Sequence, residues 1–87
     1  MEEKIKTRVV VNKYFEAGEI TPPFNSILFA NEGTSDVILN GLTILPGQVY
    51  IDNGFQEEFN FTVYRFRFVA PGVNRLMVAK KEIVNGL

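Results

Sequence analysis

The sequence predicts an all-β fold, either a small antiparallel β-sandwich or a partly open barrel of about six to seven short strands. Turn-forming pairs recur through the middle and end of the chain, and the intervals between them are short, β-branched and aromatic. None of those intervals shows the 3.6-residue period of a long amphipathic helix. The turn-forming pairs are Glu32-Gly33, Asn40-Gly41, Pro46-Gly47, Asn53-Gly54 and Pro71-Gly72.

Each expected strand is a short apolar run between two such turns. The expected strands cover residues 5–12 with a short piece at 14–15, then 26–31, 37–39, 42–44, 48–52, 59–69 and 75–79. Pro22-Pro23 removes two backbone donors, so that stretch is expected to be a loop or a sheet edge. Residues 55–58 are expected to form a loop or at most one helical turn, and the tail from residue 83 to 87 is expected to be loose.

The strongest local prediction is the hairpin that turns at Asn40-Gly41. A two-residue type I′ turn needs positive φ at both central positions, which Asn and Gly tolerate. This turn places Leu39 opposite Leu42 and Val37 opposite Ile44 on one face. Ile38 and Thr43 then face the other way.

The expected strand at 59–69 contains a change of phase. Apolar residues occupy odd positions up to Val63 and even positions from Tyr64 onward. Because side chains alternate with a period of two, such a slip predicts a bulge near Val63-Tyr64, or a strand that passes from one layer to another.

The chain of 87 residues predicts a single domain, 1–87, with flexible termini. It has no cysteine and no histidine, which excludes disulfides, thiolate metal sites and histidine-based catalysis. The net charge of −1 gives no strong attraction to nucleic acid or anionic membranes. No run approaches the length of a membrane helix, and the charged start Glu2-Glu3-Lys4 does not resemble a signal peptide. We therefore expect no enzyme, no metal and no cofactor.

The remaining candidate chemistry is weak. Glu57-Glu58 and Asp52 are the nearest approach to an acidic cluster, and a solvated loop explains them better than a glycosidase pair or a calcium site. Several lysines accompany Ser26 and Ser35, but nothing in the sequence brings a Ser-Lys pair together. The glycines match no phosphate-binding motif.

The run from Tyr64 to Phe68 alternates rings with Arg65 and Arg67. Aromatics interleaved with arginine occur in single-strand nucleic-acid platforms, but strict alternation puts rings and arginines on opposite faces of a strand. The rings are expected in the core and the arginines on a solvated or subunit-facing row. Tyr64, Arg65 and Arg67 are the candidate interface residues.

A resemblance adds to this interpretation. The stretch from residue 29 to 48 combines Asn31, Gly33-Thr34, an apolar hairpin with Asn40-Gly41, and Leu45-Pro46-Gly47. It resembles a pattern of small bacteriophage particle proteins: decoration, head-fibre or tail-associated subunits. The match covers about a quarter of the chain and carries no binding residue. It implies a β-sandwich subunit that forms a homo-oligomer and attaches to other virion proteins.

We therefore expect a virion structural or accessory protein, made in the host cytoplasm without a signal peptide and incorporated into the particle. The alternative is a free-standing binding module for carbohydrate or peptide, although the chain has no Trp and only three Tyr to supply amphipathic rings. An enzyme fragment and a nucleic-acid-binding barrel rank below these two.

Overall fold

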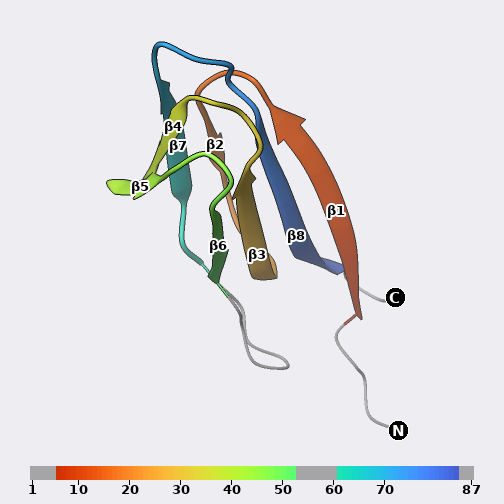
Figure 1. Ribbon diagram of the computed structural model, residues 1–87. Coiled ribbons are helices and arrows are strands. Elements are labelled where there is room, and N and C mark those ends of the chain that lie inside the picture. Colours follow the sequence, from red (N-terminus) through yellow and green to blue (C-terminus); the bar gives the residue numbers. More distant parts are fainter. Residues whose placement is uncertain (1–5, 53–60, 85–87) are drawn as a thin grey trace, which may run out of the picture.

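The computed structural model describes residues 6–52 and 61–84, which form eight strands in two four-stranded antiparallel sheets (Figure 1). The order in sheet A is β1-β8-β3-β6, and the order in sheet B is β2-β7-β4-β5. Sheet A comprises β1 (Lys6–Tyr14), β8 (Leu76–Val84), β3 (Phe24–Asn31) and β6 (Val49–Asp52). Sheet B comprises β2 (Gly18–Ile20), β7 (Tyr64–Val69), β4 (Asp36–Leu39) and β5 (Leu42–Ile44). The predicted all-β sandwich is confirmed, with eight strands rather than six or seven, and the sheets do not close into a barrel.

The core lies between the inner faces of the two sheets. Phe29 on β3 contacts Tyr64 on β7 at a ring-centroid distance of 5.0 Å, which joins the layers at their centre. Each large apolar side chain buried here stabilises the fold by about 1.5–3 kcal/mol. The buried apolar residues are Ile20, Phe24, Ile27, Phe29, Val37, Leu39, Ile44, Tyr64, Phe66, Leu76 and Val78.

The hairpin of β4 and β5 is confirmed in every detail of its register. Leu39 pairs with Leu42, Val37 with Ile44 and Ile38 with Thr43. The turn residues have positive φ, 47° at Asn40 and 86° at Gly41. Local turn chemistry alone was sufficient to predict this element.

Among the described residues, the predicted strand at 59–69 begins too early. Residues 61–63 are not a strand, and residues 53–60, which include the expected loop at 55–58, lie outside the described part of the chain. β7 begins at Tyr64, because its neighbours β2 and β4 pair only with residues 64–69. The change of phase therefore marks the start of the strand rather than a bulge inside it. The register shift in sheet A instead falls in β3, between Phe24 and Ser26.

The last strand is longer than predicted. β8 continues through Lys80, Lys81 and Glu82 to Val84, because it lies between β1 and β3 and pairs with both. β1 likewise extends without a break to Tyr14. The short strand β2 was not predicted, since three residues carry too little pattern, and it forms only by pairing with β7.

Two chain segments cross between the sheets side by side and form what we call the crossover corner, residues 31–35 and 73–75. Main-chain hydrogen bonds join them, from Thr34 N to Val73 O (2.8 Å) and from Glu32 N to Arg75 O (2.9 Å). The hydroxyl of buried Ser35 donates to Asn74 Oδ1 (2.7 Å). The corner therefore fixes the position of one sheet relative to the other.

Candidate protein-docking face

The three residues predicted for an interface lie in two different environments. Tyr64 faces the core, is 3% exposed, and donates its hydroxyl hydrogen bond to Asp52 of β6. Arg65 and Arg67 alternate with it and are exposed on the outer face of sheet B. The predicted separation of rings from arginines is thus confirmed, and Tyr64 belongs with the rings.

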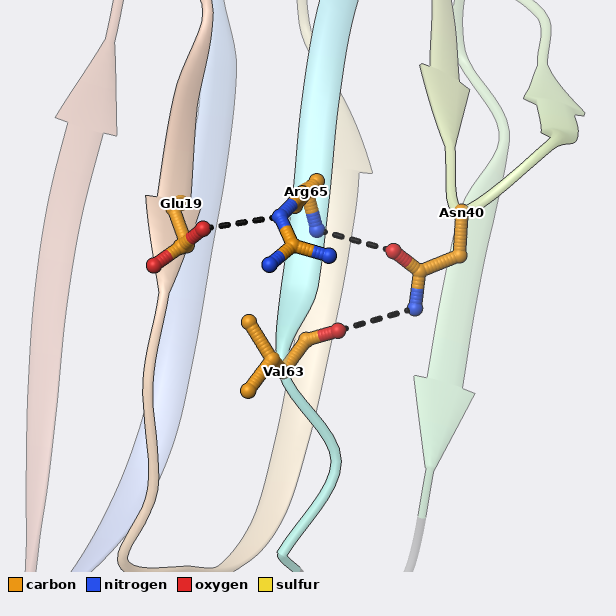
Figure 2. A network of polar contacts seen from close by, with 4 residues as sticks. All are labelled: Glu19, Asn40, Val63 and Arg65. Atoms are coloured by element: carbon orange, nitrogen blue, oxygen red, sulfur yellow. Dashed lines mark hydrogen bonds and ion pairs between the residues drawn. The ribbon is translucent and has the colours of Figure 1, made fainter.

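Arg65 takes part in a polar network on sheet B (Figure 2). Its Nε donates to Glu19 Oε2 at 2.9 Å, across the pairing of β2 with β7. Both side chains are well exposed, so this ion pair contributes little to stability. Arg67 has no ion pair among the residues that the structure describes.

Asn40 holds the hairpin turn against β7 in the same network. Its side-chain amide donates to Val63 O (3.1 Å) and its Oδ1 accepts from Arg65 N (2.8 Å). Its own main-chain N–H donates to Arg65 O (2.9 Å). The residue that makes the turn possible therefore also forms hydrogen bonds with the backbone groups at the start of β7.

We expect Asn40→Ala to lower the free energy of unfolding by about 2 kcal/mol, since it removes two hydrogen bonds and puts Ala at positive φ. Arg65→Gln is the matched control and should cost less than about 0.5 kcal/mol, because it removes only an exposed ion pair. Urea denaturation of both variants measures the difference. Equal losses would show that the turn residue acts only as a surface group.

The central part of the outer face of sheet A is apolar and includes residues from all four strands. Directly opposed residues of antiparallel strands share a face, so the register defines two adjacent rows that are apolar except for Lys13 at one end. One row reads Val11, Ala79, Leu28 and Ile51 from β1 to β6. The next reads Lys13, Met77, Ala30 and Val49. We call the apolar face the set Val9, Val11, Leu28, Ala30, Val49, Ile51, Met77 and Ala79.

The edges of the apolar face are open to solvent. Val9 and Val11 on β1 are 67% and 56% exposed, and Val49 and Ile51 on β6 are 53% and 51% exposed. The residues on the two central strands are half-buried by their neighbours within the sheet. Contiguous exposed apolar surface of this kind is characteristic of contact sites.

Charged residues border the apolar face at both ends. At the end near the crossover corner, Glu32 lies 3.5 Å from Lys13 Nζ and 3.6 Å from Arg75 Nε. Lys81 lies beyond the other end of the two rows, between Val9 and Ser26. Within the described residues, Lys81 makes no ion pair.

A second ionic group lies on the inner side of the same sheet. Glu82 accepts a hydrogen bond from Arg8 Nε at 3.2 Å and lies 3.2 Å from Lys80 Nζ. The hydrogen bond from Lys80, aided by Arg8 and opposed by partial burial, lowers the pKa of Glu82 below its ordinary value. The carboxylate therefore stays ionised at neutral pH and links β1 to β8.

The described surface offers little that could support chemistry. Two shallow hollows of about 260 and 270 Å³ lie along the edges of β5 and β6, around Leu42 and Tyr50. Within residues 6–52 and 61–84, no three acidic side chains converge to hold a metal ion. The same residues include no helix that is long and apolar enough to cross a membrane. The apolar face is accordingly the main candidate site, and its geometry suits contact with another protein.

Comparisons of the chain with protein-family models, with curated proteins and with solved structures find no match.

Proposed function

We propose that this chain is a structural subunit of a bacteriophage particle, a decoration, head-fibre or tail-associated protein that acts by protein–protein assembly. The observation that carries the proposal is the apolar face, because a four-stranded sheet with exposed Val on one edge strand and exposed Val and Ile on the other calls for a covering partner. The resemblance of residues 29–48 to small phage particle proteins gives the kind of assembly. In the structure this stretch runs from the end of β3 through the β4–β5 hairpin.

The two outer faces support an assembly role in different ways. The apolar face of sheet A suits a buried contact, whereas Arg65 and Arg67 on sheet B suit a polar contact that remains partly solvated. A subunit that lies between two neighbours in a particle needs two such surfaces. Arg65 and Arg67 therefore remain candidates for a second interface.

The tyrosines lend less support to a carbohydrate-binding module. Tyr14 and Tyr50 are half-buried and pack on core rings, with centroid distances of 5.2 Å to Phe66 and 6.3 Å to Phe29. Tyr64 is buried. Sugar stacking uses flat, exposed amphipathic rings, and none of the three tyrosines provides one.

The proposal is tested by finding where the chain resides after particles assemble. We expect mass spectrometry of gradient-purified particles to detect the chain in several copies per particle, and its gene to lie beside capsid, portal or tail genes. A chain that is abundant in the soluble extract and missing from the particles would overturn the proposal. Binding to a glycan array by the purified chain would favour the alternative module.

A further inference from the structure

The centre of the apolar face carries an alternating pattern of large and small side chains. On β8 Met77 is large and Ala79 is small, whereas on β3 the register places Ala30 beside Met77 and Leu28 beside Ala79. A two-fold axis that runs parallel to the strands, midway between β3 and β8, places β8 of one copy over β3 of the other at the same height. Met77 then covers Ala30 of the second copy, and Leu28 covers its Ala79. Large residues over small ones allow two sheets to interdigitate.

We infer that the apolar face pairs with the same face of a second copy about this axis, giving a two-fold dimer with two stacked A sheets. The inference rests on the proposed assembly function and names its first partner. Isologous two-fold dimers are the commonest oligomers, and they require a self-complementary surface of this kind.

Charge selects the direction of the axis. A two-fold axis across the strands would also set large residues over small ones, but it would place Arg75 against Lys81 of the second copy. The axis along the strands places Arg75 against Glu32 of the second copy, since these residues lie side by side in the crossover corner, one position beyond the ends of β8 and β3. Lys81 then faces Ser26. Opposite charges meet only when the axis runs along the strands, so the contact between Arg75 and Glu32 selects that orientation.

The area of sheet A is sufficient for such a dimer. Its two longest strands have nine residues each. The other two have eight and four residues, so 30 strand residues at about 4.8 Å spacing and about 3.4 Å rise give a face of roughly 500 Å². Two copies would bury roughly 1,000 Å² or more, which is the range where specific interfaces begin.

The first test measures mass in solution against concentration. We expect sedimentation equilibrium to give twice the chain mass of 9.9 kDa at micromolar concentration. Leu28→Glu, at the centre of the apolar face, should weaken the dimer at least 100-fold. Ile38→Glu is the matched control, since Ile38 is a half-buried residue on the outer face of sheet B, opposite Arg67, and it should leave the dimer intact. Circular dichroism checks that both variants fold. A wild-type monomer at 0.5 mM (about a hundred times the working concentration), or loss of the dimer in Ile38→Glu alone, would overturn the inference.

The second test addresses the axis by mixing two charge variants. Glu32→Arg and Arg75→Glu should each weaken their own homodimer about tenfold, because like charges then meet across the interface. When the two variants are mixed, every facing pair is again opposite in charge, so a heterodimer should form with nearly wild-type affinity. Native mass spectrometry of variants with different isotope labels counts the heterodimers. A mixture that dimerises no better than either variant alone would refute the proposed axis.

The experiments distinguish a failure of the dimer inference from a failure of the proposed function. If the wild type is monomeric but is still found in purified particles, the dimer is refuted and the proposed function stands. If a dimer forms but the particles lack the chain, the proposed function is refuted and the dimer stands.

Discussion

Gly33→Ala is expected to lower the free energy of unfolding by about 4 kcal/mol, close to the whole stability of a domain this small. A Cβ at Gly33 would lie 2.1 Å from Val73 O and 2.8 Å from Arg75 N. Both atoms belong to backbone in the crossover corner, which cannot move without breaking the hydrogen bonds from Thr34 N and Glu32 N. The loss combines overpacking with about 1 kcal/mol for each hydrogen bond that opens.

Gly47→Ala separates this steric effect from the ordinary cost of replacing glycine. Gly47 has φ of +82°, and a Cβ there would meet nothing within 4 Å, so only conformational strain of about 1 kcal/mol applies. Chemical denaturation of the two variants gives the comparison, and a Gly33→Ala protein that cannot be recovered folded is the extreme form of the expected result. Similar losses at Gly33 and Gly47 would contradict close packing of the corner.

The sequence was sufficient to predict those parts of the fold that depend on residues close together along the chain. The β4–β5 hairpin follows from Asn40-Gly41, whose conformational preferences set both the turn and the register. The ends of β7 and β8 depend on which strands lie beside them. Charged residues such as Lys80 and Glu82 resemble a tail in sequence, yet they extend a central strand because both of its neighbours are long. Only the strand order supplies that information.

The candidate site was missed for a related reason, although a signal for it exists. β3 is apolar on both faces, with Phe29 turned inward and Leu28 outward, whereas strands of antiparallel sheets commonly have one solvated face. The run Val9-Val10-Val11 shows the same property. Assembling these residues into one face requires the order β1-β8-β3-β6, which no local pattern contains. The interface prediction named the arginines of β7 because their alternation with aromatic residues is visible within a single strand.

Asn31 concentrates the polar links between the two sheets in one buried side chain. It is 2% exposed at the end of β3. Its amide nitrogen donates to Ser35 O (2.8 Å) and to Ile44 O (2.9 Å), and its Oδ1 accepts from Gly33 N (3.1 Å). Both N–H donors and one acceptor position of the oxygen are used within the protein, so no apolar or acidic residue of similar size can replace it without leaving a backbone group unpaired.

We expect Asn31→Asp to lower the free energy of unfolding at pH 7 by about 4 kcal/mol. A buried carboxylate would face two carbonyl oxygens and would lack the two N–H donors that pair with them in the wild type. Burial and these oxygens must raise the carboxyl pKa in the folded state above the value of about 3.9 in the unfolded chain. A raised folded pKa means that the folded variant binds protons more readily than the unfolded one. The stability deficit relative to wild type should therefore shrink as the pH falls from the folded pKa toward the unfolded one, by about 1.4 kcal/mol for each pH unit between them.

The deficit should not disappear at low pH, since a neutral carboxyl group donates one hydrogen bond where the amide donates two. Asn12→Asp is the matched control: it adds the same charge at an exposed position on β1 and should change stability by less than about 0.5 kcal/mol, with no such pH profile. Urea denaturation of the wild type and both variants from pH 7 to pH 4 gives the required curves. An Asn31→Asp deficit that is flat or grows toward low pH would mean that the side chain does not donate to these carbonyls, and the crossover corner would then need another explanation for its rigidity.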